Sequence, residues 1–291
     1  MSIIRQYNYQ PNQMARSLRG GQSRVIGILV PDISSEYYSS MTKEIQTALL
    51  AEDYLAIICN TDENIDEANK FLKFFRSQKI DGLVYIGNNE IDVEGEMPTI
   101  YIDRDPREQS THQDSAYVIE CDNYQGGYLA GKELVKKGAK RPGFVCYDLR
   151  IPIHQRRLQG FRSALSEAGI PLPENCIISR ETLSSEQGED AAKQLLNAVP
   201  DTDGIFVATD IMAYGALNYL RDQGKKVPED IRLVGFDDIS TSRLPKLTTV
   251  RQPMDQMGRL AAEWMIRILS GKKIHARHVR IPVELVVRET T

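Results

Sequence analysis

The strongest constraint on the fold of this chain is a repeated alternation of short apolar runs with amphipathic stretches. Residues 24–30 (RVIGILV) form a continuous β-rich run, and a helical pattern of apolar residues follows over residues 38–52. The same order recurs, with β-rich runs at residues 54–59 and 82–86 and a helical stretch at 65–77 between them. Apolar runs without alternation suit strands that are buried on both faces of a parallel sheet. The order therefore predicts an α/β fold with an open parallel sheet and helices on both of its faces.

A second series of the same kind begins after Asp122. Its β-rich runs lie at residues 143–147, 177–178, 204–208 and 231–236, with helical stretches at 124–137, 154–168, 185–198 and 211–223. No Gly/Ser-rich linker separates the two halves, and 291 residues are enough for two domains of ordinary size. We therefore expect two doubly wound parallel-sheet subdomains that exchange short crossovers and face each other across a ligand cleft.

A basic stretch precedes the first strand. Residues 1–31 contain four arginines and no Asp or Glu, although the whole chain has a net charge of −4. Pro11 suits the first turn of a helix, and Gly20-Gly21 ends a run of helix formers. The predicted helix of about two turns is far shorter than the ~12–15 residues that a helix needs alone in water. Such a helix needs a partner, and DNA is the polyanion that fits its charge.

The composition limits the compartment and the chemistry. The longest apolar runs are too short to span a membrane, and no apolar segment of a secretory signal follows the start. No pair of cysteines has C-x-x-C spacing, and three of the four end β-like runs, where we expect small buried thiols rather than metal or redox sites; the four are Cys59, Cys121, Cys146 and Cys176. We expect a cytoplasmic protein in a reducing compartment, with no metal, no cofactor and no membrane partner.

Polar residues follow several of the predicted strands. Ligands of open parallel sheets bind outside the carboxyl ends of the strands. Carboxylates there accept hydrogen bonds from hydroxyl groups, an arginine donates a fork, and aromatic rings stack on a sugar. Taken singly, each of these residues is better explained as a turn or helix-cap residue. As a set they favour a polyhydroxylated ligand; the set comprises Asp32, Asn60, Thr61, Asp103, Arg104, Asp122, Asn123, Asp210, Asp237 and Asp238, with Arg157, Tyr37 and Tyr38.

Signatures of enzymes are missing from the sequence. Gly27 stands alone where a dinucleotide-binding fold has G-x-G-x-x-G, and there is no P-loop lysine motif. The histidines form no H-E-x-x-H motif, and no serine has a G-x-S-x-G context. Asp237 and Asp238 are a poor acid/base pair, because adjacent residues on a strand point to opposite faces. We therefore predict that the protein is not an enzyme.

Ten segments, in order and over essentially the whole chain, resemble the lactose-repressor/galactose-repressor (LacI/GalR) family of bacterial transcription regulators. YQPNQMARSLR resembles the hinge helix of that family, and RVIGILVPDISSEYYSSM resembles its first strand and helix. The others are DGLVYIG, PTIYIDR, ECDNYQGGYLAGKEL, RRLQGFRSAL, GIFVATDIMAYGAL, VPEDIRLVGFDD, LPKLTTVRQPMDQMG and VELVVRET. Residues 2–7 resemble the last helix of the family's helix-turn-helix headpiece, most of which is missing from this sequence. The family's core resembles periplasmic sugar-binding proteins of type I, which carry a signal peptide and no hinge helix.

The resemblance implies roles for individual residues. Leu18 matches a leucine that wedges between base steps in the minor groove. Further DNA contacts are implied for Asn12, Ala15 and Arg16. Contacts with a small effector are implied for Tyr37, Tyr38, Asp103, Arg104, Arg157, Leu183, Asp210 and Asp237. Ser35-Glu36 and Thr209 depart from the family's usual residues, so the resemblance does not indicate which sugar is bound.

We expect four parts in the chain: a remnant of the headpiece at residues 1–8, a hinge helix and linker at 9–23, and two effector-binding subdomains at 24–121 with 251–279 and at 122–250 with 280–291. The expected protein is a homodimeric repressor whose effector, a sugar, phosphosugar or nucleoside-like molecule, controls binding of operator DNA through the hinge helix. One alternative is a stand-alone sugar-binding protein of the same fold without a regulatory role. Another is a small hydrolase or epimerase on that fold.

Overall fold

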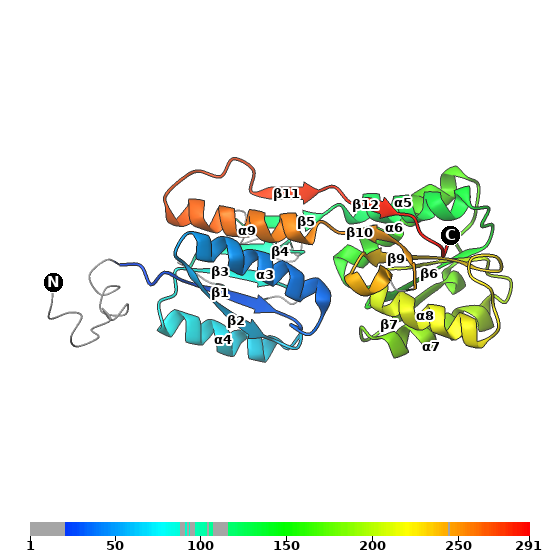
Figure 1. Cartoon of the computed structure of the whole chain (residues 1–291), viewed down its shortest axis with the longest axis horizontal. Helices are drawn as coiled ribbons and strands as arrows, with labels where there is room; N and C mark the ends of the chain where they lie inside the picture. Colours follow the sequence, from blue (N-terminus) through cyan, green and yellow to red (C-terminus); the bar gives the residue numbers. More distant parts are fainter. Residues whose placement is uncertain are drawn as a thin grey trace. The chain divides into compact units, whose positions relative to one another are not determined.

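The computed structural model describes residues 21–87, 91, 93, 97–103, 105–106, 116–243 and 245–291. These residues form two compact units, each with a central sheet and helices on both of its faces (Figure 1). The first unit comprises the chain up to Ile119 together with Gly258–His278, and the second comprises Glu120–Met257 together with Val279–Thr291. The predicted α/β class with two parallel-sheet units is therefore confirmed. The predicted hinge helix and headpiece remnant lie outside the described residues.

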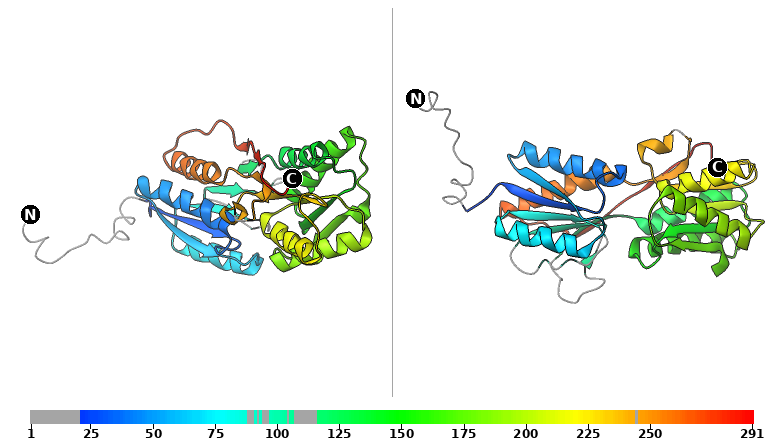
Figure 2. Two further views of the ribbon diagram at one scale, coloured as in Figure 1. Left: turned by 45° about the vertical axis from the view of Figure 1, so that its right-hand side comes forward. Right: turned by 90° about the horizontal axis from the view of Figure 1, so that it is seen from below.

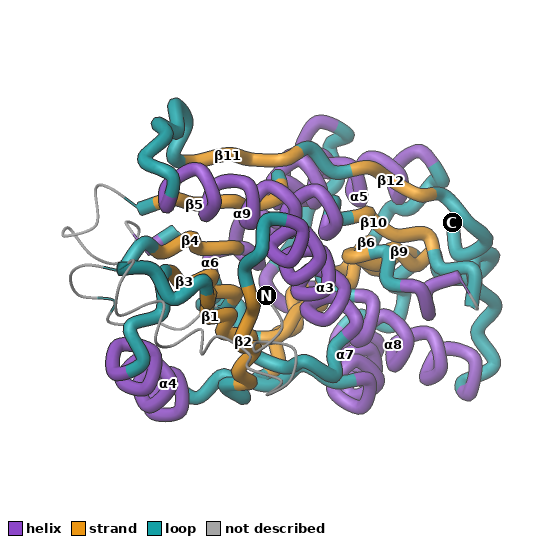
Figure 3. The backbone as a smooth tube through the Cα atoms, turned by 60° about the vertical axis from the view of Figure 1, so that its left-hand side comes forward, coloured by secondary structure: helices purple, strands orange, loops and turns teal. Residues whose placement is uncertain are grey.

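The first unit is built on a six-stranded sheet with the order β11-β5-β4-β3-β1-β2 (Figure 3). Neighbouring strands among β1 to β5 pair in parallel. The strands are β1 (Val25–Val30), β2 (Leu55–Asn60), β3 (Gly82–Ile86), β4 (Thr99–Ile102), β5 (Tyr117–Cys121) and β11 (His278–Ile281). The helices are α3 (Glu36–Ala51), α4 (Ile65–Ser77) and α9 (Met254–Leu269). Helices α3 and α9 cover one face of the sheet and α4 covers the other (Figure 2).

Helix α4 shows how the sequence sets an element of this unit. The side chain of Asn64 caps its start by accepting hydrogen bonds from the backbone N–H groups of Asp66 and Glu67 at 2.8 and 3.3 Å. Those two acids lie in the first turn and Arg76 in the last, as the helix dipole favours. Its inner face places Phe75, with no exposed surface, in a core against the sheet.

The second unit is built on a six-stranded sheet with the order β12-β10-β9-β8-β6-β7, in which β12 pairs antiparallel to β10. The strands are β6 (Pro142–Tyr147), β7 (Ile177–Arg180), β8 (Gly204–Val207), β9 (Arg232–Asp237), β10 (Thr248–Arg251) and β12 (Glu284–Val286). The helices are α5 (Asn123–Lys136), α6 (Pro152–Glu167), α7 (Ser185–Ala198) and α8 (Asp210–Asp222), with short 3₁₀ turns at Glu174–Cys176 and Ser240–Arg243.

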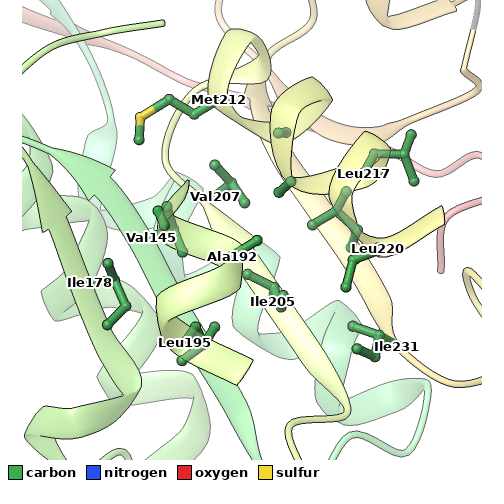
Figure 4. Packing of buried hydrophobic residues seen from close by; sticks show 14 of the residues in the cluster. Val145, Ile178, Ala192, Leu195, Ile205, Val207, Met212, Leu217, Leu220 and Ile231 are labelled. Carbon is green, nitrogen blue, oxygen red and sulfur yellow. The ribbon is translucent and has the colours of Figure 1, made fainter. Parts of the chain in front are cut away.

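Two apolar layers hold the second sheet. On one face, Val145, Ile205 and Val207 of the strands pack against Leu195 of α7 and Leu217 of α8 (Figure 4). On the other face, α5 and α6 cover a run of aromatic rings from β6, α6, β8 and β9 whose neighbouring centroids lie 5.3 to 6.3 Å apart: Phe144, Phe161, Phe206 and Phe236. Both strand faces are thus buried, as the unalternated apolar runs predicted.

Strand β10 lies where no strand was expected, because its four residues, TTVR, contain no apolar run. All four cysteines are free and buried, which confirms the prediction of small buried thiols. Across the part of the chain that the structure describes, every helix is too short or too polar to cross a lipid bilayer.

Candidate effector site

The first group of candidate residues lies in the first unit, where α3 begins after β1 and the chain leaves β4. Tyr37 donates a hydrogen bond from its hydroxyl to the Oδ2 atom of Asp103. Tyr38 is buried and meets the Tyr37 ring edge-on at a centroid distance of 5.1 Å. Asp103 has a φ of 61°, a conformation that non-glycine residues rarely adopt and that is frequent at binding sites. The structure therefore brings three of the predicted effector residues together, while Arg104 lies outside the described residues.

The second group surrounds Arg157 in the second unit. Arg157 is only 2% exposed and lies in the second turn of α6. Its Nε atom donates to Oδ1 of Asn123 at 2.8 Å, and one terminal nitrogen donates to the carbonyl of Ala208 at 2.6 Å. Its guanidinium also lies 3.6 Å from the centre of the Phe236 ring, in a cation–π contact. A buried, rigidly held fork of donors at the strand ends is suited to ligand hydroxyl or carbonyl oxygens.

Asp210 and Asp237 lie close together at the neighbouring carboxyl ends of β8 and β9. The backbone N–H of Asp210 donates to Oδ2 of Asp237 at 3.4 Å. The Asp210 carboxyl has no exposed surface and accepts from Thr249 Oγ1 at 2.6 Å and from the N–H of Ile239 at 3.3 Å. Burial, with the negative charge of Asp237, raises the pKa of Asp210 well above its ordinary value. Gly235 leaves the room for this carboxyl, because a Cβ there would collide with it.

Asp237 and Asp238 are adjacent but serve different partners. Asp237 has a φ of 124° and accepts a hydrogen bond from Nε2 of Gln252 at 2.7 Å. Asp238 forms ion pairs with Arg288 at 2.5 Å and Arg251 at 2.7 Å. Burial acts to raise the pKa of Asp238, but the hydrogen bonds from the two arginines outweigh it, so this pKa is lowered. The two carboxylates are therefore not arranged as an acid/base pair.

One buried polar residue of this region, His154, was not singled out from the sequence. It lies one turn before Arg157 and has no exposed surface; burial, with the charge of Arg157, lowers its pKa to about 3. Its Nδ1 lies 3.2 Å from the carbonyl of Asp148, and its Nε2 has no hydrogen-bond partner among the described residues. The hydroxyl of Thr209 also has no hydrogen-bond partner among those residues. His154 lies in the first turn of α6, where nothing in the sequence distinguishes it from an ordinary helix residue.

Leu183 has a different setting from the polar candidates. It is partly buried and packs against the apolar core of the second unit, just before α7. The predicted DNA-contacting residues Asn12, Ala15, Arg16 and Leu18 all lie outside the described residues. Among the described residues, no three His, Cys, Asp or Glu side chains gather as a metal site would require.

Comparisons with known proteins give a consistent result. A family model described as a periplasmic binding protein-like domain matches residues 132–291. The transcriptional regulator DegA of Bacillus subtilis is 30% identical over 297 residues, which span 100% of this chain and 88% of that protein. The ribose operon repressor of Halalkalibacterium halodurans is 28% identical over 297 residues, which span 100% of this chain and 86% of that protein. A solved LacI family transcriptional regulator from Enterococcus faecium with bound ribose is 27% identical, with a TM-score of 0.79, over 92% of this chain and 98% of that chain.

Proposed function

This chain belongs to the LacI family of transcriptional regulators, and we propose that it is the core of a repressor that responds to a small sugar-like effector. Its relatives are transcription regulators and not enzymes. The observation that carries the proposal is the buried fork of Arg157, which is held by Asn123 and by the carbonyl of Ala208 just after β8, while the carboxylate of Asp237 ends the neighbouring strand β9. A fixed donor and a fixed acceptor at the ends of neighbouring strands suit a ligand with several hydroxyl groups, which donate and accept at once.

The chemistry of the candidate residues supports a polyhydroxylated effector. In the first unit, Tyr37 and Asp103 offer a hydroxyl, a carboxylate and an aromatic face. We propose that the two units are the two effector-binding subdomains and that each supplies one group of contacts; the proposed contacts are Tyr37, Tyr38, Asp103, Arg104, Arg157, Leu183, Asp210 and Asp237. One relative is named a ribose operon repressor and a solved relative holds ribose, so pentoses are the first effectors to test.

The proposal extends to DNA through the N-terminal stretch. We propose that residues 9–23 form a hinge helix whose Asn12, Ala15, Arg16 and Leu18 contact operator DNA, in a cytoplasmic protein. Effector binding then changes the stability of the DNA complex, and by linkage DNA changes the affinity for the effector by the same factor.

The exposed apolar residues of the first unit support a homodimer. β2 is the edge strand of its sheet, yet Leu55 and Ile58 on it are 51% and 37% exposed. Phe74 and Ile65 on the neighbouring α4 are 47% and 38% exposed. An apolar edge strand of this kind is a template for pairing with another chain. We propose that a second copy covers it.

A melting-temperature screen tests the effector proposal. The panel contains pentoses, hexoses, disaccharides, phosphorylated sugars, nucleosides and purine bases. A true effector at about one hundred times its Kd should raise the melting temperature by roughly 5 °C or more. The R157K variant keeps the charge but loses the planar fork, so its affinity for that effector should fall at least about tenfold. The control is R162K, because Arg162 lies on the same helix in an exposed ion pair with Glu174. No shift with any compound would contradict the proposal.

A DNA-binding measurement distinguishes the proposed repressor from the alternative, a stand-alone sugar-binding protein. Protein from the complete reading frame is mixed with DNA from around its own gene, and complexes are followed by gel shift with and without the effector. The repressor proposal expects a complex whose affinity the effector changes. A sugar that binds while no DNA complex forms, or while the complex is unaffected, favours the alternative.

A further inference from the structure

Glu120 is a buried carboxylate held between two arginines. It lies in β5 and is the first residue of the second unit, and its side chain is 1% exposed. Nη1 of Arg156 donates to its Oε2 at 2.5 Å, and Nε of Arg280 donates to its Oε1 at 2.6 Å. A buried charge of this kind persists only when it is paired and hydrogen-bonded. The three side chains therefore form one linked cluster, called here the Glu120 cluster.

The cluster joins two places where the chain passes between its units. Glu120 follows the first passage, and Arg280 lies two residues after the last one, at residues 278 and 279. The backbones are paired on both sides of the cluster, because the N–H of Val118 donates to Arg277 at 2.7 Å and that of Asp122 donates to Ile281 at 2.9 Å. The relative register of β5 and β11 therefore determines where the Glu120 carboxylate meets Arg280, while Arg156 reaches the same carboxylate from α6.

The third member of the cluster precedes the effector arginine directly. Arg156 and Arg157 are neighbours on α6, and both donate hydrogen bonds to residues 120–123: Arg156 to Glu120 and Arg157 to Asn123. At the start of α6 the N-cap residue Ile151 makes no side-chain cap and the first turn contains no acid. The contacts of the two arginines with Glu120 and Asn123 are therefore among the polar anchors at the beginning of the helix, together with the bond from Arg157 to the carbonyl of Ala208.

We propose that Glu120 is a positioning residue for Arg157, and that it makes the place of this arginine depend on the register of β5 and β11. The proposal rests on the proposed function of Arg157 as an effector contact. A shift between the two strands would move Arg156 with the carboxylate and would turn the first turns of α6. Effector binding at Arg157 and the segments that connect the units would then influence each other through three side chains.

Hydrogen exchange on the full chain without any ligand tests the coupling. The variants are E120Q, R280Q and R280K, and the region followed is the start of α6, residues 152–160. R280Q is the decisive variant, because Arg280 is 56% exposed and donates its hydrogen bond to Glu120 from β11, an element other than α6. We expect about tenfold faster exchange at the start of α6 in E120Q and R280Q, as for loss of a charge-assisted hydrogen bond, and near wild-type exchange in R280K.

A matched control separates positioning from general loss of stability. Glu133 is also a buried carboxylate of the second unit, but it binds Lys137 and Thr291 at the far end of α5. E133Q should lower the melting temperature while leaving exchange at the start of α6 unchanged. Unchanged exchange there in R280Q, or the same increase in E133Q, overturns the proposal.

Titration of the same variants with D-ribose, and with any compound that shifts the melting temperature in the panel, tests the link to Arg157. We expect E120Q and R280Q to weaken binding by about tenfold and E133Q to leave it unchanged. Normal affinity in E120Q with altered exchange at α6 overturns the positioning role. If no compound binds the wild type, the proposed function fails, and the exchange result still decides whether Glu120 positions the helix.

Discussion

Asp210 begins α8 and Asp238 directly follows β9 in the second unit, and their surroundings move their pKa values in opposite directions. Burial and the charge of Asp237 raise the pKa of Asp210 in the folded protein. The protonated Asp210 side chain therefore stabilises the fold fully at pH values below its pKa in the unfolded chain. This stabilisation is lost as the pH rises through the pKa of Asp210 in the folded protein. Asp238 is held by Arg288 and Arg251 and its pKa is lowered, so its contribution is present above the unfolded pKa and is lost as pH falls through the folded pKa.

The variants D210N and D238N should therefore show opposite pH dependences. The melting temperature of D210N relative to wild type should rise between pH 4 and pH 8, because the amide resembles the protonated acid. D238N should be destabilised by ~2 kcal/mol at neutral pH, and the deficit should shrink toward acid pH. Calorimetry of the three proteins across that range provides the measurement, with equal slopes in both variants as the contradicting result.

The same residues show why a site is harder to predict than a fold. The sequence identified Asp210, Asp237 and Asp238 as acids at strand ends, but that position is shared by ligand contacts, caps and buried supports. Whether the Asp210 carboxyl accepts from Thr249 and Ile239 depends on packing between β9, β10 and α8, which no local pattern encodes. Gln252 and Glu120 were not singled out for the same reason, because their contacts with Asp237 and with Arg156 and Arg280 depend on the fold.

At the scale of elements, a close helix crossing made possible by glycines holds Arg157, the proposed effector contact. A Cβ on Gly127 of α5 would collide with the backbone of Arg157, and one on Gly160 of α6 would collide with the backbone of Tyr124. Glycines also allow a close crossing of α7 and α8, because a Cβ on Gly188 or Gly215 would collide with the backbone of the facing helix. The two crossings cover opposite faces of one sheet, and only the first carries Arg157.

Alanine substitutions in the two crossings should have equal structural costs and different functional effects. G127A and G188A should each destabilise the protein by ~1–3 kcal/mol, since the facing backbone must move away. Only G127A should also weaken effector binding, by about tenfold or more, because it displaces the turn that bears Arg157. Urea denaturation gives the first quantity and titration calorimetry the second. Comparable losses of affinity in both variants would show that the crossing has no specific role.

Helices and strands could be predicted from the sequence where the pattern of apolar residues was strong. The buried strands and the amphipathic helices were predictable because burial on both faces or on one stripe dictates their composition. β10 was missed, since its place in the sheet depends on pairing with β9 and β12 rather than on its own four residues. The sheet that β11 joins could not be predicted either, because its four residues, HVRI, do not specify a partner strand.

At the scale of the whole molecule, the proposed repressor requires two copies of the chain. The exposed apolar surface of β2 and α4 should be the contact, so the wild type should sediment as a dimer at micromolar concentration. In the double variant L55K/F74E the two substituted side chains are already exposed in one copy, at 51% and 47%. The melting temperature of the monomeric unit should hardly change, while the dimer should weaken by about 100-fold or more, from two lost apolar contacts and the desolvation of two charges.

The control is V287K, which places a charge on an exposed apolar residue of the second unit, 49% exposed in the wild type. Its sedimentation should match that of the wild type. A wild-type protein that sediments as a monomer at about 10 µM would contradict the proposal. Dimers that survive L55K/F74E but dissociate in V287K would move the contact to the second unit, and the hinge helices would then need another route to pair on DNA.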